Sequence, residues 1–200
     1  MKKKIILFIL IVILVYAIGG VVYVLLNKKP EVIKISNLDT IKGYNYTLRS
    51  NDTQIYKNEF NNLKHNLESN SVNNEEYASS VAKLFIIDLY TLNNKINKYD
   101  VGGVSFVYPD AVSNYKLNVQ NTIYKYMEDN TNKNRNQKLP EVSGIDLTNI
   151  EKTNYNINDK SYEGYKINLE WTYVEDFGYD SAGEVILIKS DKYYYVVEKN

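Results

Sequence analysis

Hydrophobic and polar positions divide this chain into an apolar N-terminal segment and a longer region of mixed polarity. The apolar run extends without interruption from Ile5 to Leu26, and lysines flank it on both sides. With a rise of about 1.5 Å per residue, a helix of this length spans about 33 Å, enough to cross a hydrocarbon core of about 30 Å. We therefore predict a transmembrane anchor over residues 5–26, after a tail at residues 1–4 and before a spacer at residues 27–40.

A cleavable signal peptide is the alternative for this segment, because basic residues precede it and Ala17-Ile18-Gly19 resembles a cleavage site. The apolar run continues through Val21–Leu26, whereas the hydrophobic part of a signal peptide usually covers about 7 to 15 residues. A retained anchor is therefore the favoured interpretation. The chain has no cysteine, which excludes attachment through a lipidated thiol.

The charges around the apolar run predict its orientation. Lys2, Lys3 and Lys4 precede it, whereas two lysines follow it, and this bias favours a cytoplasmic N-terminus. We therefore predict a single-pass protein of the cell membrane, with the lipid bilayer as its partner over residues 5–26 and its C-terminal domain outside the cytoplasm. Frequent Asn, Lys, Ile and Tyr are typical of AT-rich bacterial genomes, so a bacterial membrane is expected.

The first half of the region after residue 40 has mainly helical periodicity. One strand is predicted first, because apolar and polar residues alternate over Gly43–Arg49, and Ser50-Asn51-Asp52 then offers a cap for a helix. Asn73-Asn74 opens a second helix, a short strand is expected over Val104–Tyr108, and Pro109-Asp110 leads into a third helix. The apolar positions that recur at helical spacing are Tyr56, Phe60, Leu63 and Leu67 in the first helix, Ala78, Val81, Ala82, Phe85, Leu89 and Leu92 in the second, and Val112, Tyr115, Val119, Ile123 and Tyr126 in the third.

The last 60 residues change to the period of strands. Apolar side chains alternate with polar ones over Tyr165–Tyr173, and a weaker strand is predicted over Val142–Ile150. Glu184–Lys189 and Lys192–Glu198 form a predicted hairpin around Ser190-Asp191. Helices followed by strands predict one α+β domain over residues 41–200, with three helices packed on a curved antiparallel sheet.

This order of elements resembles the nuclear transport factor 2-like superfamily, whose domains fold three helices and a strongly bent antiparallel sheet into a cone. Combined with the N-terminal anchor, the chain looks most like the extracytoplasmic scaffold subunits of type IV secretion and conjugation machines. The resemblance covers about residues 41–200 and rests on topology, and the strand before the first helix departs from the superfamily pattern. It implies a cone whose interior is a filled core, a ligand pocket or an enzyme pocket, so the fold alone does not decide the function.

Charge argues against a nucleic-acid-binding surface. Five of the 24 basic residues flank the apolar run, so the remainder of the chain carries a net charge of about −5. The only basic cluster there, Lys133–Lys138, lies in an Asn-rich stretch and is predicted to be a solvated loop. We therefore expect no nucleic-acid partner.

Few residues suggest catalytic or metal chemistry. The one histidine, His65, lies among polar residues and is expected to face solvent. With no cysteine and one histidine, the usual zinc and iron ligand sets and a Ser-His-Asp triad are not available, so no cofactor is predicted. Asp100-Val101-Gly102-Gly103 lacks the lysine of a phosphate-binding loop and is interpreted as a turn with positive φ. Glu175, Asp176 and Asp180 form an acidic hairpin without EF-hand spacing.

Asp88 is the strongest candidate for a functional polar residue. At 100° per residue it falls within the apolar arc of the second helix, close to Val81 and Phe85. A buried carboxylate must be paired or protonated, and Arg49 or a tyrosine hydroxyl is the expected partner. Two roles remain open for Asp88: a structural tie between helix and sheet, and an acid or base in a cone-shaped pocket.

The 20 tyrosines suggest an interaction surface. Because side chains alternate along a strand, Tyr193, Tyr194 and Tyr195 must point to both faces of the sheet. A ring on a face without helices would belong to an exposed aromatic patch, so these three residues are a candidate interface.

Three functions remain open from the sequence. The favoured one is protein–protein interaction by an extracytoplasmic scaffold domain of a bacterial envelope assembly, with a protein partner or a second copy of the chain. The second is a small-ligand-binding module, and the third is a hydratase-like or isomerase-like enzyme that uses Asp88 and tyrosine hydroxyls in the cone. No catalytic motif is present, so the chain is predicted not to be an enzyme.

Overall fold

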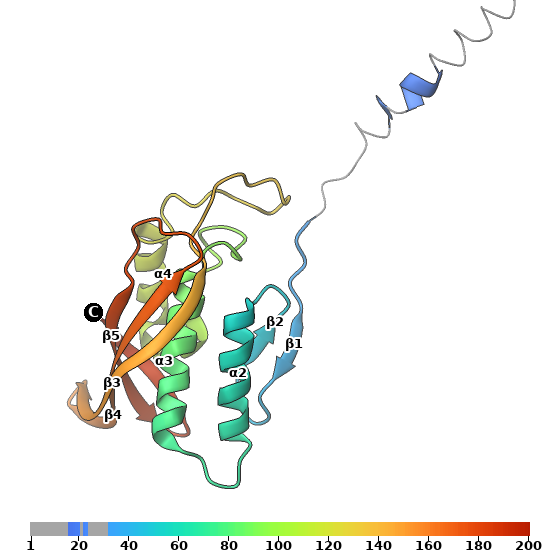
Figure 1. Ribbon diagram of the computed structural model, residues 1–200. Helices are drawn as coiled ribbons and strands as arrows, with labels where there is room; N and C mark the ends of the chain where they lie inside the picture. Colours follow the sequence, from blue (N-terminus) through green and yellow to red (C-terminus); the bar gives the residue numbers. More distant parts are fainter. Residues whose placement is uncertain (1–15, 21, 24–31) are drawn as a thin grey trace, which may run out of the picture. The chain divides into compact units, whose positions relative to one another are not determined.

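The computed structural model describes residues 16–20, 22–23 and 32–200 (Figure 1). Residues 16–20 and 22–23 are helical, and no helix in the described part of the chain is both long and apolar enough to cross a bilayer. The predicted tail at residues 1–4, most of the predicted anchor at residues 5–26 and part of the spacer lie outside the described residues. One compact unit begins at Ile33 and ends at Asn200.

The domain opens with a small antiparallel pair of strands, β1 (Asn37–Thr40) and β2 (Thr47–Arg49). Part of the predicted spacer is therefore a strand, and the strand predicted over Gly43–Arg49 is wrong in its first half. The reason is a turn: Tyr44 N donates to Ile41 O, and Gly43 has a φ of 80°, a conformation that glycine adopts readily. The chain reverses there, and only the last three residues pair with β1.

The two predicted helices that follow are confirmed as α2 (Gln54–Leu67) and α3 (Asn74–Tyr90). The predicted apolar positions of both helices are buried. Asn73 caps α3, because its side chain accepts hydrogen bonds from the backbone N–H groups of Glu75 and Glu76. The cap predicted for α2 is wrong: Thr53 occupies the cap position without a side-chain hydrogen bond.

The segment between α3 and the next helix contains two 3₁₀ turns. The first part of the strand predicted over Val104–Tyr108 is instead a 3₁₀ turn, η1 (Val104–Phe106), which follows Gly103 with its φ of 76°. Only Val107 forms a β-bridge, with Val196. A second 3₁₀ turn, η2 (Pro109–Ala111), leads into α4 (Val112–Asn121).

Of the apolar face predicted for the third helix, Val112, Tyr115, Val119 and Ile123 pack on the core and Tyr126 does not. The helix ends at Asn121 because Thr122 leaves helical geometry, with φ and ψ of −121° and −92°. Tyr124 turns into the core in consequence, and Tyr126 is 78% exposed.

The second half of the domain is an antiparallel meander. Its strands are β3 (Val142–Ile157), β4 (Lys160–Tyr173), β5 (Ala182–Ser190) and β6 (Tyr193–Lys199), paired in that order. The weak strand predicted over Val142–Ile150 is thus part of a strand of 16 residues. Asn158 and Asp159 both have positive φ and make the two-residue turn between β3 and β4, and the hairpin predicted around Ser190-Asp191 is confirmed.

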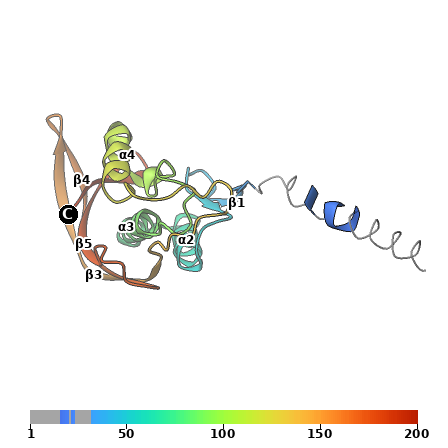
Figure 2. The ribbon, with the colours of Figure 1, turned by 90° about the horizontal axis from the view of Figure 1, so that it is seen from above.

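Helix α3 is the centre of the core. It contacts all four strands of the sheet, which curves around it, while α2 lies on the side of α3 away from the sheet (Figure 2). The sheet contributes alternate residues of β4, and these are buried as the period-2 pattern predicts: Tyr165, Ile167, Leu169 and Trp171. A mixed α+β domain with an antiparallel sheet is therefore confirmed.

The cap of α3 gives a first testable prediction. Replacing Asn73 by alanine removes both cap hydrogen bonds and is expected to lower the free energy of unfolding by about 1 kcal/mol. Asn70→Ala, in the same loop, changes an exposed side chain and is the matched control. Urea unfolding of both variants measures the difference, and equal stabilities would contradict the assigned cap.

Candidate functional site

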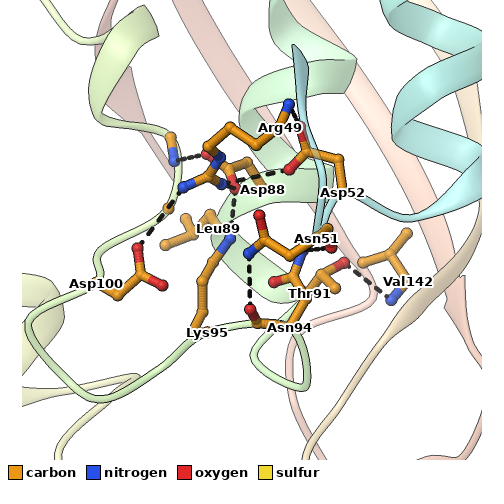
Figure 3. Close-up of polar contacts among 12 residues, drawn as sticks. Arg49, Asn51, Asp52, Asp88, Leu89, Thr91, Asn94, Lys95, Asp100 and Val142 are labelled. Atoms are coloured by element: carbon orange, nitrogen blue, oxygen red, sulfur yellow. Dashed lines mark hydrogen bonds and ion pairs between the residues drawn. The ribbon is translucent and has the colours of Figure 1, made fainter. Parts of the chain in front are cut away.

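The Asp88 carboxylate lies at the centre of a buried polar cluster near the end of α3 (Figure 3). Its Oδ1 accepts hydrogen bonds from Arg49 Nη2, at 3.0 Å, and from Lys95 Nζ. Its Oδ2 accepts from the backbone N–H of Gly103, at 2.7 Å. Three separate segments, the end of β2, the loop after α3 and the turn before η1, therefore meet at one side chain.

Close backbone packing holds the turn at Gly102 against α3. A Cβ atom at Gly102 would lie 1.9 Å from the carbonyl oxygen of Asp88, so only glycine fits there. Two tyrosines bind the backbone of Gly102: Tyr115 donates to Gly102 O at 2.7 Å, and Tyr124 accepts from Gly102 N while donating to Leu89 O at 2.8 Å. The expected positive-φ turn is present, at Gly103, and its role is to bring a backbone N–H to Asp88.

Two further carboxylates complete the charge cluster around Arg49. Its guanidinium lies 3.4 Å from Asp52 Oδ1 and 3.6 Å from Asp100 Oδ1. Asp52 also accepts a hydrogen bond of 2.6 Å from the backbone N–H of Arg49. Arg49 thus bridges three carboxylates, whereas the Lys95 side chain is fully buried and contacts Asp88.

The cluster keeps Asp88 ionised. Burial by itself raises the pKa of the Asp88 carboxyl, but the positive charges of Lys95 and Arg49 outweigh it, and the pKa lies below its ordinary value. At Asp52, burial raises the pKa, and the hydrogen bond and charge of Arg49 oppose it only in part. The pKa of Arg49 is lowered by burial but raised overall by the three carboxylates, so its charge persists.

Sequence reasoning paired Asp88 with Arg49, and the structure brings these two side chains together. It missed Lys95. This residue lies in the polar run Asn93-Asn94-Lys95, where apolar residues do not recur at the spacing of a helix or a strand. The predicted loop over Lys133–Lys138 is present, and Arg135 within it donates to the carbonyl groups of Lys95 and Asn93. Nothing local in the sequence signals either contact.

The other candidate residues lie apart from this cluster. His65 is exposed on α2, as predicted. Asp180 accepts hydrogen bonds from Tyr90 Oη and Lys199 Nζ, so the acidic hairpin is tied to α3 and β6. Within the described residues, no group of three His, Cys, Asp or Glu side chains is arranged to hold a metal ion.

The three consecutive tyrosines of β6 point to both faces of the sheet, as the strand period requires. Tyr194 is buried beside Tyr77 and Tyr165. On the other face, the rings of Tyr193 and Tyr195 stack on each other with centroids 5.5 Å apart. The ring of Tyr193 also packs against Tyr44 and Tyr46 before β2, so its face is partly covered.

Two clefts lie along β3. The larger has a volume of about 540 Å³ and lies between α2, the first half of α3 and the side chains of Leu147 and Ile150. The smaller, about 400 Å³, continues past Lys152 to Asn154 and reaches Tyr165 and Tyr194. Neither cleft is lined by Asp88 or Arg49, so the charge cluster does not face either of them.

Comparison with family models, curated proteins and solved structures finds no match to this chain.

The buried cluster predicts strong coupling between Asp88 and Lys95. Asp88→Asn leaves Lys95 without its counter-charge and is expected to lower the free energy of unfolding by about 3–5 kcal/mol. Combining Asp88→Asn with Lys95→Met removes both charges and is expected to cost less than the sum of the two single changes. Lys138→Met, in the exposed pair with Glu175, is the control and is expected to have little effect. Additive losses in the double variant would contradict the direct pair.

The depressed pKa of Asp88 also predicts a pH dependence. A carboxyl whose pKa is lower in the folded state stabilises the fold above its unfolded pKa of about 3.9, and this contribution is lost as the pH falls through the folded value. The difference in unfolding free energy between wild type and Asp88→Asn should therefore be constant above about pH 5 and should shrink below about pH 4. Urea unfolding across this range measures it; a difference that persists in acid would show that ionisation of Asp88 is not the source of the stability.

Proposed function

We propose that this chain is a single-pass membrane protein whose folded domain acts through protein–protein contact, as a scaffold or assembly component of a bacterial envelope machine. The apolar segment at residues 5–26 is the proposed anchor, and the excess of lysine before it supports a domain outside the cytoplasm. This function requires neither a catalytic residue nor a cofactor.

The observation that carries the proposal is the complete engagement of Asp88. Its two carboxylate oxygens accept hydrogen bonds from Arg49, Lys95 and Gly103, and its residue is 8% exposed. A general acid or base must reach a substrate, whereas each donor here belongs to the protein and is part of its packing. The arrangement therefore supports a structural tie and weakens the proposal of a pocket enzyme.

The packing of the concave sheet face supports the same conclusion. Helix α3 fills the space that a ligand would occupy in an open cone, and the core side chains of the helix and the sheet are almost completely buried: Phe85, Leu89, Ile167, Leu169, Trp171, Val185 and Leu187. We propose on this basis that the domain is a filled cone of the nuclear transport factor 2-like kind, with its function on the outer surface.

Exposed apolar side chains give the surface a means of binding protein. Val174 is 70% exposed beside the half-exposed Phe177, both in the β4–β5 connection. These residues line a shallow cleft with Leu139, near the charged pair Lys138–Glu175. An apolar centre with a polar rim is the usual composition of a protein interface.

A small-ligand module is the second candidate, favoured by the volume of the cleft beside Leu147 and Ile150. A volume of about 540 Å³ lies in the range of ligand pockets. Its lining is polar, with Glu59, His65 and Lys83 among its residues, so a polar ligand would be expected. Such a ligand would raise the melting temperature of the protein, and the rise would grow with the ratio of the free ligand concentration to the Kd.

Site-specific photo-cross-linking in cells tests the proposed function. A photoreactive amino acid at Val174 or Phe177 of the full chain is expected to capture a distinct partner protein, whereas the same probe at Asn70, an exposed polar position, is expected to capture none. Blots of membrane fractions measure the adducts by mass. The scaffold proposal would be contradicted if these and other exposed apolar positions gave no adducts. If small polar metabolites also raised the melting temperature, ligand binding would become the proposed function.

A further inference from the structure

The two edges of the four-stranded sheet differ in how they are covered. At the β6 edge, Val107 forms a parallel bridge with Val196, and Tyr108 N donates to Val196 O. At the other edge, β3 pairs with β4 alone, and no other strand of the described chain pairs with it. The β6 edge is therefore partly blocked, and the β3 edge is open.

The open edge is long and regular. A bulge at Thr148 keeps Leu147 and Ile150 on the same face of the sheet, opposite Leu169 and Ile167 of β4. From Asn149 to Ile157 the pairing with β4 has no further irregularity, and only Val142 of the whole strand is buried. Every second residue of this stretch presents its backbone N–H and C=O away from β4, which is the template that an added strand needs.

The larger of the two clefts lies beside this edge, whereas the smaller one extends from β3 across the sheet to Glu163, Lys189 and Tyr194. Leu147 and Ile150 line the larger cleft, and Lys152–Asn154 line the smaller one. The opposite wall is the start of α3, where Asn73 lines the first cleft and Asn74 the second. An extended chain added to β3 would therefore have space for its inward side chains beside Leu147 and Ile150.

The charge of the larger cleft indicates what kind of chain it accepts. Glu59, Glu75 and Glu76 line it, and Lys83 is the opposing cation among its lining residues. Glu75 and Glu76 lie in the first turn of α3, and both are exposed. A segment with lysine or arginine at alternate positions would place positive charges opposite these carboxylates, whereas a second copy of β3 would bring two acidic clefts together.

We propose that the free edge of β3 binds an extended basic segment of a partner protein as a fifth strand, with its basic side chains in the cleft lined by Glu59, Glu75 and Glu76. This inference rests on the proposed function and assigns the partner surface within it. Backbone hydrogen bonds along β3 supply the affinity, and the cleft supplies the preference for basic side chains.

Synthetic peptides of alternating Lys and Val, eleven residues long to match Leu147–Ile157, test the proposal on the full chain in detergent. Fluorescence anisotropy measures binding, and the same peptide with Glu in place of Lys is the charge control. Two further peptides carry N-methyl groups on either the Lys or the Val nitrogens. Because only one set of N–H groups faces β3 in an added strand, we expect one methylated peptide to bind and the other not to bind.

A charge variant of the protein tests the cleft itself. Glu75→Gln combined with Glu76→Gln is expected to weaken binding of the basic peptide about fivefold at low salt, since two exposed charges are lost. Asp110→Asn removes an exposed carboxylate next to α4 and is the matched control. Hydrogen exchange of the β3 amides is expected to slow at alternate residues when the basic peptide is bound.

Each other outcome overturns the inference. If both methylated peptides bound equally, the association would depend on charge alone. If the acidic peptide bound as tightly as the basic one, the carboxylates would have no role in the preference. A photo-cross-link from Asn149 to an adduct of twice the chain mass would assign the edge to a second copy. If no peptide binds while the probe at Val174 still captures a partner, the β3 inference fails and the proposed function stands; if that probe also captures nothing, both fail.

Discussion

The ionised Asp88 carboxylate is the contact that joins three separate segments of the first half of this domain. It comes from the central helix α3, and its partners come from the end of β2, from the loop after α3 and from the turn before η1. A charge in this position is stable only because each oxygen has a donor and two cations lie next to it. The positions of Arg49, Lys95 and Gly103 are consequently linked, and the loops that carry them are ordered around one side chain.

Helix α3 depends on this arrangement because it is buried around nearly its whole circumference. The sheet covers one side, α2 covers another, and the segment from Gly102 to Tyr124 covers its C-terminal end. A helix enclosed in this way must be apolar on every side, and its single buried carboxylate must be paired within the protein. The interior around α3 is therefore filled by packed side chains.

The surface is uneven in a way that follows from the meander topology. A four-stranded sheet has two edges, and the bridge from Val107 covers part of one of them. The other edge, along β3, is 16 residues long and lies beside the cleft lined by Glu59, Glu75 and Glu76. Open edges invite pairing with other chains, so proteins either protect them or use them. Bulges at the start of β3 protect its first half, and the regular second half remains available.

The sequence by itself determined the elements whose period is sustained: α2, α3, β4 and the hairpin of β5 and β6, together with the apolar arc around Asp88. Their apolar positions can be read from the sequence, because the spacing of apolar residues, every 2 or about every 3.6 positions, involves only nearby residues. Only the tertiary structure decided that Lys95 is buried, that Tyr124 replaces Tyr126 in the core and that β1 pairs with β2. The physical reason is that each of these features depends on partners that are distant in the chain. This holds for a buried charge, for a helix end without a strong stop signal and for a short strand. No local pattern encodes those partners.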